Sequence, residues 1–252
     1  MTAKGARGGF ENESNIIESF NLMDKEAITW LRHMGHDPNE VSKVKAYKAP
    51  PRVKPDVICE IFDRSGALVA SEKLSAKKAA GKRGFNQIDR GDVVTRYLGM
   101  WPDMPPLTVE GLRLFTGNLP PAGKSRVPKR MFFDELPNGH QESITNFFTE
   151  NKTRIVRDLL AGREPNMAKW FLGRDEERDK WTLLPIEDAV DFYSKGSVGP
   201  TIRGSIRIGT LTAQRKGGDK GMPTATNLQF KFDPNLIGQL VAESEKDKQG
   251  KH

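Results

Sequence analysis

Asp56 and Lys73 bracket two apolar, β-branched runs, residues 57–62 and 67–70. The runs flank an Asp-Arg-Ser-Gly turn at 63–66, a sequence typical of a β-hairpin. An antiparallel hairpin brings its two open ends together, so we expect Asp56 and Lys73 to lie side by side. A charge within a strand costs free energy unless it is paired or binds something. The two residues are therefore either a structural ion pair at the sheet margin or the acid and base of a site.

A second polar block precedes the strand that alternation predicts at 227–232. Its side chains are of the types that read the edges of DNA bases. Its glycines would let the backbone approach a groove closely. Two strands joined by such a loop form a β-ribbon that fits a major groove, although an ordinary charged hairpin loop is the alternative. The residues of the block are Gln214, Arg215, Lys216, Gly217, Gly218, Asp219 and Lys220.

Helices and strands predicted from hydrophobic periodicity must position these groups. Apolar residues at helical spacing predict two helices within 10–34 and one helix over 141–161. The basic stretch 43–54, with its two prolines, is expected to be a loop or an edge segment. Further strands are predicted at 168–172, 181–184 and 201–212, and short helices at 93–98, 107–115 and 185–193.

The composition limits the class of protein. The chain has 252 residues, 36% of them hydrophobic, which is enough for a core. No apolar run is long enough to cross a membrane, and the N-terminus lacks the apolar segment of a signal peptide. The single cysteine, Cys59, fits a reducing compartment, and we expect a cytoplasmic protein. No Cys/His cluster has zinc spacing.

A formal net charge of +7 favours an anionic partner. The basic residues are clustered, which suits contacts to DNA phosphates but also describes independent solvated loops. The clusters lie at 43–54, 77–83, 124–130 and 203–231.

Three motifs give the chain a family resemblance. They are Gly9-Phe10-Glu11-Asn12-Glu13 near the start, Pro55-Asp56 with Ser71-Glu72-Lys73-Leu74 and Gly84-Phe85-Asn86-Gln87 in the middle, and the polar block with Leu228-Gln229-Phe230-Lys231 near the end. In this order they resemble the type II restriction endonucleases of the PD-(D/E)xK superfamily. The resemblance is to the small members that cut short GC-rich sites such as GCGC and CCGG.

The resemblance implies a site-specific double-stranded DNA endonuclease that uses Mg²⁺. A bound Mg²⁺ lowers the pKa of water and relieves charge on the phosphate, and one or two carboxylates suffice to hold it. Asp56 would be the principal metal ligand, and Lys73 would position the attacking water and offset developing charge. Glu13 resembles the extra acid that some members use for a second metal or a water.

The motif departs from the family at the residue two before the lysine, which is usually acidic and here is Ser71. Ser71 could contribute its hydroxyl to the metal or to its water, and this option is favoured. Alternatively, Glu72 reaches in through a bulge, or the active lysine is Lys77 in Ser75-Ala76-Lys77.

The resemblance also implies an α/β fold, with a mixed central β-sheet flanked by helices and a C-terminal β-ribbon for base reading. We expect a single domain over 1–252, with a catalytic half at 1–100, a helical and DNA-recognition half at 101–242 and a frayed tail at 243–252. Asn86 and Gln87 are expected to face the DNA or, alternatively, to cap the next helix.

Two rival functions remain at this point: a repair or junction nuclease of the same superfamily, and a DNA-binding protein without catalysis. The expected partner is double-stranded DNA, with no membrane association. A restriction enzyme also implies a cognate DNA methyltransferase in its host, and both a monomer and a homodimer fit the sequence.

Overall fold

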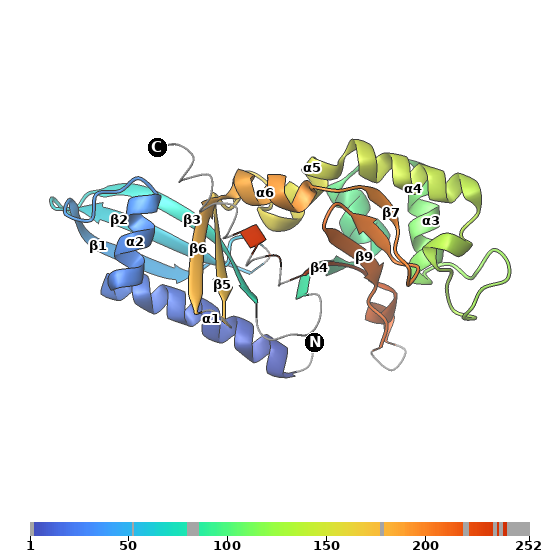
Figure 1. Cartoon of the computed structure of the whole chain (residues 1–252), viewed down its shortest axis with the longest axis horizontal. Coiled ribbons are helices and arrows are strands. Elements are labelled where there is room, and N and C mark those ends of the chain that lie inside the picture. The colour runs from blue at the N-terminus through green and yellow to red at the C-terminus, as the bar shows by residue number, and fades with distance from the viewer. Residues whose placement is uncertain are drawn as a thin grey trace. The chain divides into compact units, whose positions relative to one another are not determined.

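The chain forms two compact units, each with its own sheet (Figure 1). The computed structural model describes residues 3–51, 53–79, 86–176, 179–218, 222–233, 236 and 239–240. The first unit comprises Met1–Arg83, Leu160–Val190 and Pro234–His252, and the second comprises Gly84–Leu159 and Asp191–Asp233. The tail predicted at 243–252 lies outside the described residues, and the single domain over 1–252 stays a prediction.

The first unit is built on a five-stranded sheet of order β1-β2-β3-β5-β6. Strands β3 and β5 pair in parallel and the other pairs are antiparallel, so the sheet is mixed, as predicted. Its elements are α1 (Ala3–Leu22), α2 (Lys25–His33), β1 (Val41–Lys48), β2 (Val57–Asp63), β3 (Leu68–Ala79), β5 (Trp170–Asp175) and β6 (Lys180–Pro185).

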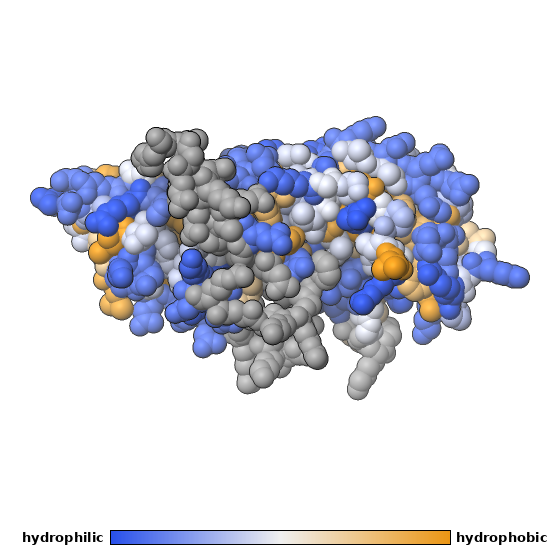
Figure 2. Space-filling model, viewed as in Figure 1, coloured by the Kyte–Doolittle hydropathy of each residue, from blue (hydrophilic) through white to orange (hydrophobic). Residues whose placement is uncertain are grey.

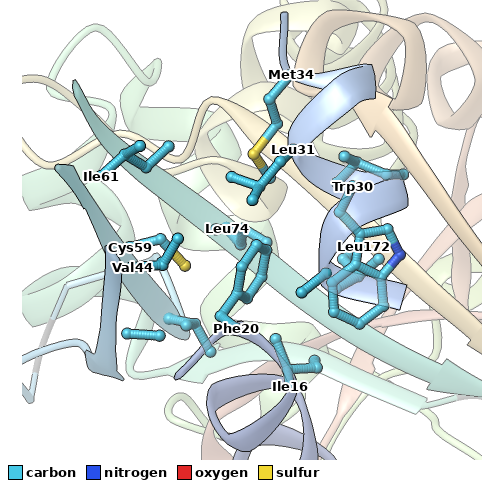
Figure 3. Close-up of a cluster of buried hydrophobic side chains, with 14 residues drawn as sticks. Ile16, Phe20, Trp30, Leu31, Met34, Val44, Cys59, Ile61, Leu74 and Leu172 are labelled. Carbon is cyan, nitrogen blue, oxygen red and sulfur yellow. The ribbon is translucent and has the colours of Figure 1, made fainter. Parts of the chain in front are cut away.

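Helices α1 and α2 cover one face of this sheet. The cluster in Figure 3 joins Phe20 of α1 and Leu31 of α2 to Cys59 and Leu74 of the sheet, all four fully buried. These apolar residues recur at helical spacing in α1 and α2 and at every second position in β2, which is why the sequence folds into these elements. Asp24 caps α2 by accepting a hydrogen bond from the backbone N–H of Ala27 at 3.0 Å.

The predicted hairpin is formed by β2 and β3. Asp63 fixes its turn, because Oδ1 accepts hydrogen bonds from the backbone N–H groups of Ser65 (2.8 Å) and Ala67 (3.0 Å). Gly66 supplies the positive φ of 83° that the turn needs. The pairing register shifts between Ile61 and Phe62, and this shift determines which residues of β3 lie opposite the start of β2.

The second unit is built on an antiparallel five-stranded sheet of order β4-β10-β9-β8-β7. The predicted ribbon is its β9–β10 pair. The strands are β4 (Asn86–Gly91), β7 (Val198–Pro200), β8 (Ile206–Ile208), β9 (Leu211–Arg215) and β10 (Leu228–Phe232). The helices are η1 (Val93–Leu98, a π-helix), α3 (Pro106–Thr116), η2 (Phe133–Glu135), α4 (Asn138–Glu150) and η4 (Pro223–Thr226).

Aromatic residues pack on one face of this second sheet. The Phe230 ring lies 5.0 Å from that of Tyr97 and 5.9 Å from that of Trp101, both in edge-on geometry. Tyr193 packs against Phe232 in the same way at 5.9 Å. This face is therefore the core face, and the opposite face carries the polar residues of β9 and β10.

One helix differs from the prediction, and the stretch 43–54 agrees with one of its two predicted alternatives. The helix expected over 141–161 is two helices, α4 and α5 (Lys152–Leu160), because Asn151 interrupts the regular turn with φ −107° and ψ 12°. The stretch 43–54 contributes β1, an edge strand of the first sheet. Helix α6 (Ile186–Ser194) follows β6, as predicted.

The part of the surface that is coloured in Figure 2 is mainly hydrophilic, with small hydrophobic areas between the hydrophilic ones. Within the described ranges, no helix combines the length and hydropathy needed to cross a bilayer.

Candidate active site

Asp56 lies just before β2 and is fixed by its backbone. Its N–H donates to the Leu74 carbonyl at 2.8 Å, and its own carbonyl accepts from the Ala49 N–H at 3.1 Å. Its carboxylate Oδ2 accepts hydrogen bonds from the Ala76 N–H at 2.7 Å and from Lys77 Nζ at 2.9 Å. The hairpin thus brings a lysine to Asp56, and that lysine is Lys77.

The expectation that Lys73 lies beside Asp56 is wrong. Lys73 is paired with Ile58, and its Nζ donates to the carbonyl of Pro165 at 2.6 Å. Because Val57 pairs with Leu74, the residue facing Asp56 across the hairpin is Ser75. The register shift leaves one extra residue, Val69, in β3, so the residue facing Asp56 lies one position further along β3 than the pairing of Phe62 with Leu68 alone would give.

Neither Ser71 nor Glu72 lies beside Asp56. Ser71 is exposed and pairs with Glu60, far along β2 from Asp56. Glu72 lies on the opposite, core-facing side of β3, where it is 7% exposed. Its Oε2 accepts from Trp170 Nε1 at 2.8 Å, and its Oε1 lies 3.2 Å from His36 Nε2. These contacts hold Glu72 in a structural network away from Asp56.

Ser75 stands to Lys77 as Ser71 stands to Lys73, two residues before the lysine. It lies two residues before Lys77, so both side chains leave the same face of β3. Ser75 is completely buried, and its Oγ makes no hydrogen bond within the described structure. A buried hydroxyl without a partner costs about 1–3 kcal/mol. Such a group suits a site that is completed by a ligand.

Glu13 is engaged with a lysine. Its Oε2 lies 2.6 Å from Nζ of Lys48, the last residue of β1. Lys48 pairs with Val57, which is the residue directly after Asp56. Glu13 therefore lies at the end of the sheet where β1 ends and β2 begins, but its charge is offset by Lys48.

The donor set at Asp56 fits a hard cation such as Mg²⁺. Among the described residues no group of three or more His, Cys, Asp or Glu side chains gathers as a metal cluster. Mg²⁺ keeps several waters and needs only one or two carboxylates. The Asp56 carboxylate and the unpartnered Ser75 hydroxyl are the oxygens that would hold the ion or its waters.

The polar face of the second sheet gathers several of the predicted DNA-binding residues. Gln214 lies opposite Gln229, and Gln87 lies opposite Lys231. Gln229 Nε2 also donates to Gln87 Oε1 at 2.5 Å. The side chain of Lys231 is partly buried, and this burial lowers the pKa of its ammonium. Gln229 and Lys231 were not named as site residues from the sequence, although alternation in the 228–232 strand places them on one face.

Arg215 does not share this polar face with Gln214. It pairs with Leu228, and strand alternation places it on the side of Ala213 and Phe230. Its Nε donates to the Ala225 carbonyl at 3.0 Å. Gln214 and Arg215 therefore lie on opposite faces of β9, and the base-reading role of each stays a prediction.

The loop after β9 begins with a defined backbone. The N–H of Lys216 donates to the Asn227 carbonyl at 2.9 Å, and the N–H of Gly217 donates to the Ala225 carbonyl at 3.0 Å. Gly217 and Gly218 both adopt positive φ, 64° and 66°. The predicted residues Asp219 and Lys220 lie outside the described residues, and Asn86 is the first residue of β4.

Comparison with known proteins supplies the family. A family model, R.HinP1I restriction endonuclease, matches residues 34–237. A crystal structure of restriction endonuclease MspI in complex with its cognate DNA has a similar fold, with a TM-score of 0.59, 15% identity and coverage of 87% of each chain. The search of curated proteins gives no match. The match over most of the chain shows that the protein belongs to the R.HinP1I restriction endonuclease family and confirms the type II restriction endonuclease predicted from its sequence.

Proposed function

We propose that this endonuclease hydrolyses double-stranded DNA at a short GC-rich site with Mg²⁺, and that Asp56, Ser75 and Lys77 form its catalytic centre. The observation that carries the proposal is the contact between Lys77 Nζ and Asp56 Oδ2 at 2.9 Å, beside a buried hydroxyl without a partner. A carboxylate that can bind a cation, a hydroxyl that can orient a water and a lysine that can offset charge are groups suited to phosphodiester hydrolysis.

Each residue has a distinct chemical part. The Asp56 carboxylate would hold the cation, and the Ser75 hydroxyl would orient a water by hydrogen bonding. The Lys77 ammonium beside Asp56 would offset the charge that develops on the phosphate in the transition state. A bound Mg²⁺ would supply Lewis acidity and a lower pKa for water. Glu13, ion-paired with Lys48, is the candidate for a second acid.

Sequence choice is assigned to the polar face of the second sheet. Gln87, Gln214, Gln229 and Lys231 line it, and these side-chain types pair with adenine and guanine edges in the major groove. Lys216 and the glycines after it extend this face, and Asn86 adjoins it at the start of β4. The MspI structure contains DNA, which supports DNA as the partner here.

The setting follows from this activity. A nuclease that cuts short sites requires a host methyltransferase that protects the same sites, and we place both in the cytoplasm, where the buried free thiol of Cys59 is compatible with reducing conditions. A homodimer would cut both strands in one encounter and a monomer in two.

Plasmid cleavage tests the proposal. The protein is incubated with supercoiled plasmid with and without Mg²⁺, and the products are separated and their ends sequenced. Discrete fragments that share one short GC-rich sequence and appear only with Mg²⁺ are expected. Nicking at junctions would indicate a repair nuclease, and binding without cleavage would contradict catalysis.

A further inference from the structure

The polar face of the second sheet carries an arginine toward each of its two edges. Arg90 lies on β4, the edge strand, and pairs with Gln229 of β10. Arg207 lies on β8 and pairs with Thr212 of β9. Thr212 pairs in turn with Lys231 of β10, so the register places both arginines on the face that carries Gln229 and Lys231.

The burial of the neighbouring residues agrees with this placement. Ile206 and Ile208, on either side of Arg207, are both fully buried, whereas Arg207 is exposed. Asp89, the residue before Arg90, is buried as well, whereas Arg90 is exposed. Strand alternation therefore directs both arginine side chains away from the core and toward solvent on the polar face.

Neither arginine is paired with a carboxylate in the part of the chain that the structure describes. Arg90 forms no ion pair there. Arg207 Nη2 donates to the Ser197 hydroxyl at 3.0 Å, and this neutral partner leaves the charge of the guanidinium without an offset. Ser197 directly precedes β7, the other edge strand, so the bond draws the Arg207 side chain toward that edge of the sheet. Arg96 and Arg126 differ, because both are ion-paired with acids.

The part of the face between the two arginines offers mainly uncharged hydrogen-bonding groups. Strands β9 and β10 contribute Thr212, Gln214 and Gln229 to it, together with Lys231. Neighbouring strands lie about 4.8 Å apart, so the three spacings from β4 to β8 separate the two arginine-bearing strands by about 14 Å. The major groove of DNA is about 12 Å wide. Such a face presents hydrogen-bonding groups to the bases and positive charge to the phosphates that border them.

We propose that Arg90 and Arg207 hold two separate backbone phosphates of the bound DNA, on either side of the bases that the polar face reads. The inference rests on the proposed function and deepens it, because it names the phosphate contacts that orient the base-reading face. Guanidinium groups suit this role, since their N–H donors match phosphate oxygens in pairs. An exposed arginine without a carboxylate partner also breaks no internal ion pair when it binds a phosphate.

The test measures DNA binding at several salt concentrations. Fluorescence anisotropy with Ca²⁺ in place of Mg²⁺ follows binding to a labelled duplex that carries the mapped cleavage site and to a scrambled duplex of equal length. The variants are Arg90→Gln, Arg207→Gln and the double variant. Arg64→Gln is the matched control, because Arg64 is an exposed arginine in the closed end of the β2–β3 hairpin, opposite the end at which Asp56 lies. Thermal unfolding of each variant confirms folding.

Two separate phosphate contacts predict a specific pattern. Each single variant weakens binding to both duplexes by the same factor and lowers the slope of log affinity against log salt by about 0.9, and the double variant lowers it by about 1.8. Arg64→Gln leaves affinity and slope unchanged. A loss confined to the cognate duplex, a double-variant change of only about 0.9 or unchanged slopes would overturn the inference while wild-type binding stands. Failure of the wild-type protein to bind either duplex would instead overturn the proposed function.

Discussion

The Ser75 hydroxyl is the least expected member of the proposed centre. It is fully buried without a hydrogen-bond partner in the described structure, although buried hydroxyls normally find one. A buried hydroxyl without a partner does not stabilise the fold. Its position in β3, two residues before Lys77, fits a role in holding a water or a cation.

Ser75→Ala separates stability from activity. Removal of an unsatisfied buried hydroxyl is expected to leave the free energy of unfolding within about 0.5 kcal/mol of the wild type or to raise it. Cleavage is expected to slow at least tenfold, with a higher Mg²⁺ concentration for half-maximal rate. Urea unfolding and plasmid cleavage measure the two quantities. A strongly destabilised variant with normal cleavage per folded molecule would show that Ser75 is structural.

The sequence indicated a contact between Asp56 and a lysine at the open end of the hairpin, but it left open which lysine makes it. Asp56, the hairpin and the option of Lys77 follow from residue types and turn signals. In the structure one extra residue of β3, Val69, has no partner in β2, and Lys73 pairs with Ile58 inside the hairpin. Strand β3 continues beyond Lys73, which brings Lys77 to Asp56. Residue types do not fix the position of such a bulge or the length of the strand.

Among the elements, the short helix η2 and the loop before it are held by one carboxylate. Burial acts to raise the pKa of Glu135, but hydrogen bonds from the Phe132 and Arg126 N–H groups, from Ser125 and from the Arg126 side chain outweigh it and lower the pKa to about 2. This carboxylate ties together residues 125–135, which also carry Arg130. The placement of Arg126 and Arg130 on the Phe132 ring therefore depends on the ionisation of Glu135.

Glu135→Gln tests this dependence through pH. A carboxylate whose pKa falls on folding stabilises the protein above its unfolded pKa, and that contribution is lost as the pH falls through the folded pKa. We expect the variant to be less stable than the wild type by roughly 1–3 kcal/mol at neutral pH. The difference should shrink only between pH 4.5 and about 2. Urea unfolding at several pH values measures it, with Glu142→Gln on α4 as an exposed control. A difference independent of pH down to about 2 would contradict the role of Glu135 ionisation.

Elements were predicted best where the hydrophobic period is strong. The hairpin, α1, α2 and β10 follow from apolar spacing. The break at Asn151 was missed because the apolar stripe continues across it, while the Asn151 side chain donates to the Phe147 carbonyl at 2.9 Å and the backbone leaves the helical range. Gln214 and Arg215 point to opposite faces because both still belong to β9. A loop prediction for this block cannot show that alternation.

For the whole molecule, the charge of +7 and its clustering favour DNA, but local ion pairs offset part of that charge. Lys48, Lys77 and Arg126 are all paired with carboxylates, so net charge overstates the number of phosphate contacts. The sequence could predict an anionic partner but not the two separate five-stranded sheets.

Salt dependence measures how many cations contact DNA. Binding to a scrambled duplex should fall linearly in log affinity against log salt, with a slope of about −0.9 for each phosphate contacted. We expect fewer contacts than there are lysines and arginines in the four basic clusters, because some of these residues are ion-paired within the protein. Anisotropy titrations from low to physiological salt give the slope. A flat response would show that phosphate contacts contribute little to binding.

The most direct measurement compares single-turnover plasmid cleavage by Lys77→Ala and Lys73→Ala with the wild type, at saturating Mg²⁺ and enzyme. Lys77 contacts Asp56, whereas Lys73 donates to the Pro165 carbonyl. The Lys77 variant should lose about 10²–10³-fold in rate, as for removal of a group that stabilises developing charge, with DNA binding retained. The Lys73 variant should cut within a few-fold of the wild type once its folded fraction is matched. Loss of cleavage in Lys73→Ala with normal cleavage in Lys77→Ala would contradict the centre formed by Asp56, Ser75 and Lys77.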